Sequence, residues 1–149
     1  MYSLKNLPNL TFKYNELKTA ATLISQKFEK IIKGFKCISE IKSEDSGILF
    51  TLLGVELKLQ AEIDPNGIQN EKGKLRTYKI NPLAEKQKQE KLDIEFAFDG
   101  FSNITYEVDG KVIKRIHHDM FPNKYIEFII PNVLENYTII LKKNHDQDQ

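Results

Sequence analysis

The stretch that decides the fold is residues 15–34, NELKTAATLISQKFEKIIKG. Its apolar residues recur at alternating spacings of four and three, which is typical of a helix with one buried face. Asn15 is a candidate N-cap, and Gly34 is suited to supply the left-handed residue that ends a helix. We therefore expect one long helix that packs on a broad apolar surface. The apolar stripe comprises Leu17, Ala20, Ala21, Ile24, Phe28, Ile31, Ile32 and Phe35.

The chain after residue 47 alternates between apolar and polar residues almost to its end, as half-buried strands do. A run that is largely apolar on both faces, 48–53, continues into strict alternation as far as Ile63. We expect a single strand here, with a bulge at Gly54 where the two patterns meet.

Turn residues divide the following region into a meander. Asp109-Gly110 is a two-residue hairpin signal, and it predicts that Val108 faces Lys111 and that Tyr106 faces Ile113. The remaining strands are predicted at 74–81, 92–98, 104–108, 111–116, 124–130 and 137–142.

These patterns predict an α+β fold in which one long N-terminal helix packs on a curved, mostly antiparallel sheet of about seven or eight strands. The alternative is a two-layer β-sandwich with the helix at one edge. We expect one domain, residues 1–143, followed by a polar tail, 144–149, that is disordered.

The composition argues against several classes of function. The 149 residues include 22 Lys and Arg against 21 Asp and Glu, a net charge of +1, so no overall field attracts nucleic acid or an anionic membrane. The N-terminal residues lack a signal-peptide pattern, and no apolar run is long enough to span a bilayer. The one cysteine, Cys37, excludes an intrachain disulfide framework. We expect a soluble, cytoplasmic protein that needs no cofactor.

The leading functional hypothesis is a small protein that binds another protein, as an inhibitor or accessory factor, through an exposed sheet face or edge. The doubly apolar run must be covered on both sides, which favours self-association as a homodimer. A leucine among polar neighbours of the helix is a further candidate contact. The predicted contact residues are Ile48, Leu49, Phe50, Leu53 and Leu23.

A first alternative is the binding of a small molecule or lipid in a cavity between the helix and the curved sheet. Nine phenylalanines and no tryptophan do not distinguish a cavity from a solid core. The residues predicted to line such a cavity are Phe28, Phe50, Phe96, Phe98 and Phe128.

A second alternative is a metal-assisted enzyme that uses His117, His118 and Asp119. Imidazole and carboxylate groups can ligate a metal or exchange protons near neutral pH. In an extended strand His117 and Asp119 would point to one side and His118 to the other. Because a third ligand is not evident, we favour a polar turn at this position and a protein that is not an enzyme.

Overall fold

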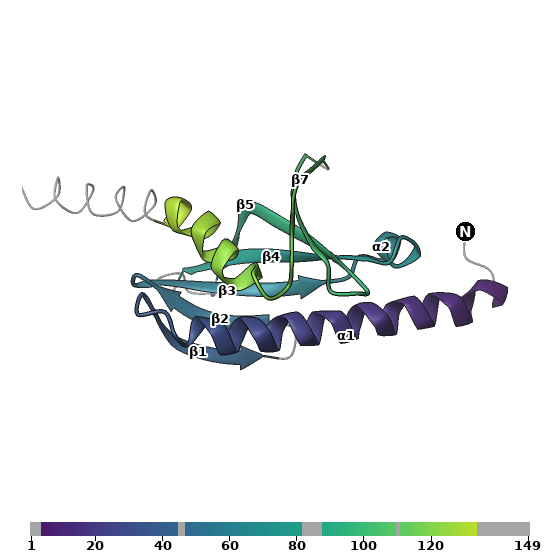
Figure 1. Cartoon of the computed structure of the whole chain (residues 1–149), viewed down its shortest axis with the longest axis horizontal. Coiled ribbons are helices and arrows are strands. Elements are labelled where there is room, and N and C mark those ends of the chain that lie inside the picture. Colours follow the sequence, from purple (N-terminus) through teal and green to yellow (C-terminus); the bar gives the residue numbers. More distant parts are fainter. Residues whose placement is uncertain (1–3, 45–46, 82–87, 110, 134–149) are drawn as a thin grey trace, which may run out of the picture.

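The computed structural model describes residues 4–44, 47–81, 88–109 and 111–133. Figure 1 shows a long helix, α1 (Leu7–Ile32), that lies along a sheet of seven strands. A single turn of 3-10 helix, η1 (Leu4–Asn6), precedes α1. The predicted α+β class, with a long N-terminal helix on a curved antiparallel sheet, is confirmed.

Helix α1 is longer than predicted. It begins at Leu7, well before Asn15, and Pro8 lies in its first turn, where a missing backbone N–H costs nothing because it would have no intrahelical acceptor. Gly34 does not take the expected left-handed conformation; its N–H donates to the Ile31 carbonyl in a tightened last turn. The buried face agrees with the predicted stripe: Leu17, Ala20, Ile24, Phe28 and Ile32.

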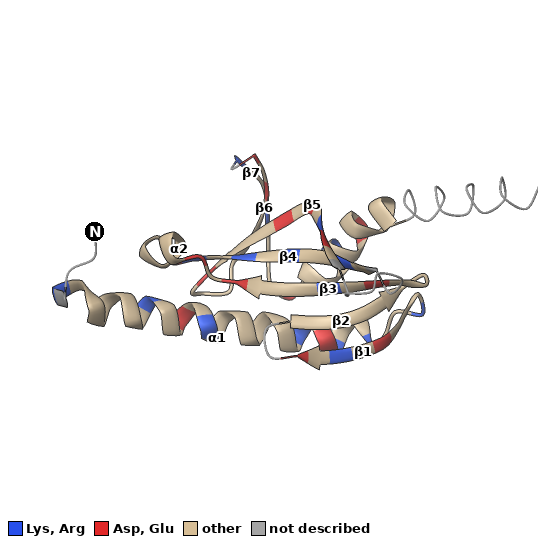
Figure 2. Ribbon diagram, turned by 180° about the vertical axis from the view of Figure 1, so that it is seen from behind, with Lys and Arg blue, Asp and Glu red and all other residues tan. Residues whose placement is uncertain are grey.

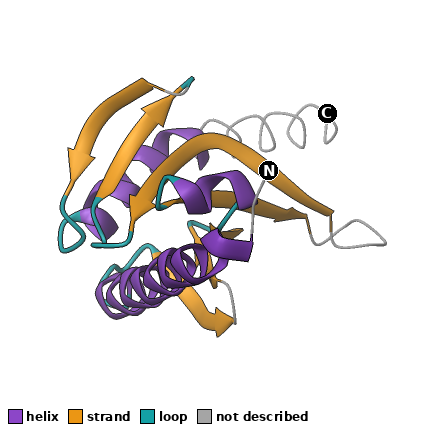
Figure 3. Cartoon of the chain, turned by 90° about the vertical axis from the view of Figure 1, so that its right-hand side faces the viewer, coloured by secondary structure: helices purple, strands orange, loops and turns teal. Residues whose placement is uncertain are grey.

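The sheet is an antiparallel meander in which every strand pairs with the next one along the chain. A short helix, α2 (Pro65–Gln69), connects the third and fourth strands. Figure 3 shows that the sheet curves around its helices. The strands are β1 (Ile38–Glu44), β2 (Gly47–Leu52), β3 (Val55–Glu62), β4 (Lys72–Asn81), β5 (Lys88–Asp99), β6 (Ile104–Val108) and β7 (Lys111–Ile116).

The predicted single strand from 48 to 63 is wrong. Leu53 and Gly54 have φ angles of 50° and 83°, and they form a tight turn that folds the segment into the β2–β3 hairpin. Two successive residues with positive φ suit the right-handed twist of such a hairpin. A leucine in the first of these positions concealed the turn, and the strand β1 beside it was not predicted.

The strand predicted at 124–130 is also wrong, because residues 121–133 are helical. Phe121, Tyr125, Ile129 and Val133 are all buried, and their spacing of four is helical. The predicted strand at 137–142 and the tail 144–149 lie outside the described residues.

The β6–β7 hairpin keeps only part of its predicted register. Val108 is opposite Lys111 as expected, but Tyr106 is opposite Lys114 and not Ile113. The register shifts between Tyr106 and Glu107, so one extra residue of β7 is accommodated by a bulge.

The core lies on the face of the sheet that α1 and the 121–133 helix share. The Phe28 ring of α1 is 5.1 Å from the Tyr125 ring of the second helix and 5.7 Å from the Phe50 ring of β2. The hydroxyl oxygens of Tyr125 and Thr77 are 2.6 Å apart in a fully buried hydrogen bond. The two helices and the sheet therefore meet in one aromatic core.

Candidate functional site

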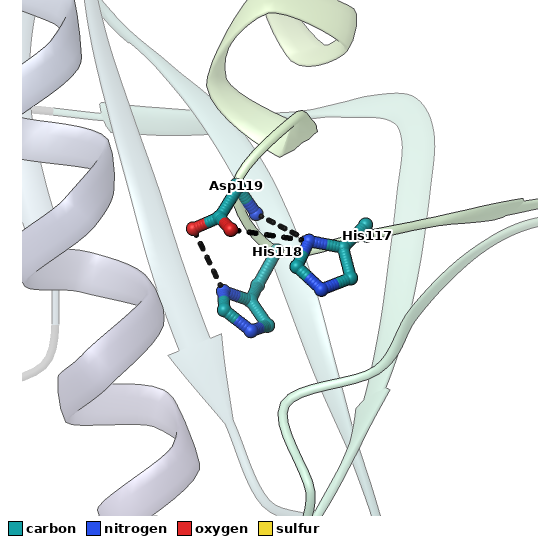
Figure 4. Close-up of side chains that lie close together, drawn as sticks. All are labelled: His117, His118 and Asp119. Atoms are coloured by element: carbon teal, nitrogen blue, oxygen red, sulfur yellow. Dashed lines mark hydrogen bonds and ion pairs between the residues drawn. The ribbon is translucent and has the colours of Figure 1, made fainter.

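The histidine cluster lies where β7 ends and the chain turns into the 121–133 helix. β7 ends at Ile116, and the next three residues, His117, His118 and Asp119, leave the strand in a turn. Their potential ligand atoms all lie within 4.8 Å of one another. Figure 4 shows both rings beside the Asp119 carboxylate.

The expected alternation of these residues is wrong. His118 does not point away from its neighbours, because the turn brings its Nδ1 atom to 3.3 Å from Asp119 Oδ1. His117 Nδ1 lies 3.4 Å from Asp119 Oδ2, and the two imidazole centroids are 4.2 Å apart. The local hydrogen bond from the Met120 N–H to the His117 carbonyl, 2.9 Å, holds this turn. All three candidate residues therefore share one small site.

A fourth member of the cluster, Lys27 of α1, has no recognisable signal in the sequence. Its Nζ atom lies 2.6 Å from Asp119 Oδ1 and 2.8 Å from His118 Nδ1. The hydrogen bond from Lys27 holds the pKa of Asp119 below its usual range. Because Lys27 is remote from the turn in sequence, only the fold reveals this contact.

The hydrogen bonds of the cluster determine which chemistry it can perform. An ammonium group has only donors, so His118 Nδ1 must accept from Lys27. His117 Nδ1 likewise accepts from the Asp119 backbone N–H at 3.2 Å. A metal ion bound between these atoms would have to displace the Lys27 ammonium, which already places a positive charge there. In this conformation the hydrogen bonds of the cluster join α1 to the turn, and His118 Nδ1 and Asp119 Oδ1 are not free to bind a metal.

The residues predicted to bind a partner fall into two groups. Ile48 and Phe50 are 1% and 0% exposed and belong to the core beneath α1. Leu49 alternates to the outer face of the sheet and is half-buried there between Lys42 and Lys58 on the neighbouring strands.

The two other predicted contact residues are exposed. Leu53 is 40% exposed in the β2–β3 turn, and Leu23 is 38% exposed on α1. Because α1 covers the face opposite Leu49, the fold does not bring Leu23 and Leu49 together on one surface.

Four of the five phenylalanines predicted to line a cavity pack against other rings: Phe28, Phe50, Phe96 and Phe128. Phe28, Phe50, Phe96 and Phe98 are at most 1% exposed. The centroid of the Phe96 ring lies 5.2 Å from that of Phe121 and 6.0 Å from that of Phe128, so aromatic side chains pack directly around Phe96. Such distances are typical of directly packed rings in a core.

A network of ion pairs covers the outer face of the sheet, and Figure 2 shows its acidic and basic residues along β3, β4 and β5. Arg76 contacts Glu62 and lies 3.2 Å from Glu95. Burial alone would raise the pKa of Glu95, but the hydrogen bond and charge of Arg76 lower it overall. Burial and a hydrogen bond to Glu62 raise the pKa of Tyr78 to about 12.

The same network includes Glu107, whose side chain is only 5% exposed. Lys72 lies 2.7 Å from one of its carboxylate oxygens, and Lys74 lies 3.5 Å from the other. These contacts outweigh burial and lower the pKa of Glu107. A carboxylate held in its ionised form is a poor general acid, and these ion pairs join β4 to β6 across β5.

The most exposed part of the sheet is β7, which the sequence pattern did not single out. Within the described residues β7 is the last strand of the sheet, with β6 on one side only. Val112 and Ile113 are 53% and 61% exposed. Figures 1 and 3 show that the tip of the β6–β7 hairpin projects from the molecule. Because a further strand was expected at 124–130, the sequence analysis did not identify β7 as an edge strand.

A hollow of about 510 Å³ lies beside β7, and we call it the β7 hollow. It is formed where β6, β7 and the turns at their ends surround a common space. Its lining includes Asp99, Asn103, Thr105, Val112, Arg115 and His117.

Comparisons of the chain with protein-family models, with curated proteins and with solved structures found no match. Among the described residues, no helix is both long and apolar enough to cross a membrane.

Proposed function

We propose that this chain is a protein-binding module that receives an extended segment of a partner protein along β7. The observation that carries the proposal is the terminal position of β7 together with the exposure of Val112 and Ile113. An edge strand presents free backbone donors and acceptors, and an added strand can satisfy them while its side chains occupy neighbouring hollows.

The opposite edge of the sheet is less suited to the same role. β1 has a positive φ of 52° at Glu40, and its register with β2 shifts between Ser39 and Lys42. A bulge of this kind, among charged side chains, is a common means of preventing strand addition. β7 also contains a bulge and three basic side chains, but unlike β1 it exposes two apolar side chains, Val112 and Ile113, beside a hollow.

The β7 hollow supports the proposal because it lies beside the strand that would be extended. Val112 and Arg115 of β7 both line it. In strand addition, backbone hydrogen bonds supply affinity, and pockets for alternate side chains supply specificity. The β7 edge offers the backbone hydrogen bonds, and the β7 hollow offers a pocket for a side chain of the partner.

Site-specific photo-crosslinking in an extract of the native host tests the proposal. A benzoylphenylalanine photo-crosslinker replaces Ile113 in one protein and Lys42, on the β1 edge, in the control. We expect a partner to crosslink from position 113 and not from position 42. The crosslink should disappear when Val112→Glu is added, with circular dichroism confirming that the variant is folded.

Two results would contradict the proposal. Equal crosslinking from both edges would show contact without preference for β7. A partner whose crosslink survives Val112→Glu unchanged would show that the edge is not the binding surface.

The proposal does not require self-association, which stays a prediction. Of the predicted contact residues, Leu23, Leu53 and Leu49 are accessible to a second copy, whereas Ile48 and Phe50 are buried in the core. We also propose a cytoplasmic location, which a free Cys37 fits.

A further inference from the structure

We infer that the segment received by β7 is acidic, with carboxylate side chains that meet the basic residues of this strand. The inference rests on the proposed function and identifies the chemistry of the partner. Lys111–Ile116, KVIKRI, contains three basic residues and no acidic one. Such a strand favours a partner segment of opposite charge.

The basic side chains of β7 are available for a partner. Lys111, Lys114 and Arg115 are all exposed. Among the described residues, no carboxylate lies within ion-pair distance of any of the three, although such pairs are numerous elsewhere on the sheet. The positive charge of β7 is therefore not neutralised by the described part of the chain.

The β7 hollow contains one acidic residue, Asp99, whose oxygens are already engaged. Oδ1 accepts from the backbone N–H groups of Phe101 and Asn103 at 2.9 and 3.0 Å, and Oδ2 accepts from the Asn103 side-chain amide at 3.0 Å. Arg115 lines the same hollow and has no carboxylate partner among the described residues. A carboxylate of the incoming segment can therefore pair with Arg115 without competing with Asp99 for a cation.

A second copy of this chain is a poor occupant of the β7 edge. Pairing β7 with β7 would place two strands with three basic residues each against one another, and like charges on paired strands are destabilising. Pairing β7 with β1 of another copy would join two different surfaces head to tail, which generates rings or open chains rather than a symmetric dimer. These considerations favour a different protein with an acidic, extended segment.

Binding of short synthetic peptides, measured by fluorescence anisotropy and by NMR shifts of backbone amides, tests the inference. Three peptides alternate valine with glutamate, glutamine or lysine. We expect the glutamate peptide to bind the intact chain about tenfold more tightly than the glutamine peptide, with shifts in 111–116. Added salt should weaken the binding of the glutamate peptide more than that of the glutamine peptide.

Charge reversal provides the matched test. The variant Lys111→Glu/Lys114→Glu/Arg115→Glu should prefer the lysine peptide, whereas Lys42→Glu on the β1 edge should retain the wild-type preference. Melting curves verify that both variants are folded. Lys114→Glu and Arg115→Glu, made singly, should each reduce the preference in part if the triple variant does not fold.

The possible results separate the inference from the proposed function. Equal binding of the glutamate and glutamine peptides at β7 would overturn the inference that the partner segment is acidic. It would leave the proposed binding at the β7 edge in place. Absence of shifts in 111–116 with all three peptides would overturn both. Growth of open oligomers with protein concentration, abolished by the triple variant, would overturn the inference in favour of a second copy.

Discussion

Thr77 of β4 and Tyr125 of the 121–133 helix share a hydrogen bond of 2.6 Å between their hydroxyl oxygens, and neither residue is exposed. Burial raises the pKa of Tyr125 far above its usual range, so its hydroxyl stays protonated. The bond is the polar contact at the centre of an otherwise aromatic and aliphatic core. It ties the sheet to a helix that the sequence pattern did not reveal.

Removing both sides of this bond should cost less than the sum of the costs of removing each side alone. Tyr125→Phe leaves the Thr77 hydroxyl buried without its partner, and we expect a loss of about 1–2 kcal/mol in the free energy of unfolding. Thr77→Val should have a similar effect. The double variant should lose less than the sum of the two, as measured by urea unfolding, and simple additivity would contradict a direct bond.

Glu107 should make the stability of the protein depend on pH in the acid range. Its folded-state pKa is lowered, so its contribution is present above the unfolded glutamate pKa of about 4.3 and is lost as pH falls through the folded value. Glu107→Gln should cost about 2 kcal/mol near pH 7. The difference from wild type should shrink below pH 4, whereas exposed Glu90→Gln should be neutral at both pH values. A constant difference would exclude a role for the Glu107 charge.

Lys27 should control the affinity of the histidine cluster for metal ions. Lys27→Met removes the ammonium from His118 and Asp119, and we expect affinity for Zn²⁺ to rise about tenfold, equivalent to about 1.4 kcal/mol. Calorimetric titration of untagged protein measures this change. Lys30→Met, an exposed position on the same helix, is the control. Unchanged affinity in Lys27→Met would contradict the statement that the Lys27 ammonium hinders metal binding. A gain that persists when His118→Ala is added would show that the metal binds elsewhere.

Gly73 should resist substitution because a Cβ atom there would overlap the Phe98 ring on the neighbouring strand. We expect Gly73→Ala to destabilise the fold by about 1–3 kcal/mol, since a packed sheet cannot easily accommodate the extra carbon. Adding Phe98→Leu should make the alanine less damaging. Thermal unfolding of the single and double variants tests this, and a neutral Gly73→Ala would show that the ring moves freely.

Much of the fold followed from the sequence because hydrophobic periodicity reports burial directly. The stripe from Leu17 to Ile32 and the alternation from Val55 to Ala61 both reflect side chains that face the core or lie beside it. The helix start escaped prediction because residues before Asn15 lie largely beyond the sheet, where burial imposes no clear pattern.

The larger errors came from competing local signals. Tyr125, Ile126 and Phe128 to Ile130 are β-branched or aromatic and favour a strand, yet Phe121, Tyr125 and Ile129 are spaced for one helical face, and Pro122 suits a first helical turn. Tertiary packing decided in favour of the helix. The Leu53 turn was hidden because leucine rarely adopts positive φ.

The histidine cluster was predicted as a group, but its chemistry was not. Proximity of His117, His118 and Asp119 follows from adjacency, whereas the contact with Lys27 depends on how α1 crosses the turn. The β7 edge could not be recognised while a further strand was expected beside it. The charge of β7 did not identify the edge either, because three basic residues in one strand indicate a binding surface only when the strand is known to be exposed.

Hydrogen–deuterium exchange of the intact chain, with and without the valine–glutamate peptide, tests the central claim most directly. If β7 receives an acidic extended segment, the amides of 111–116 should exchange more slowly with the peptide present, and those of 38–44 on the other edge should not change. Protection at β1, protection along α1, or no protection at all would contradict the account.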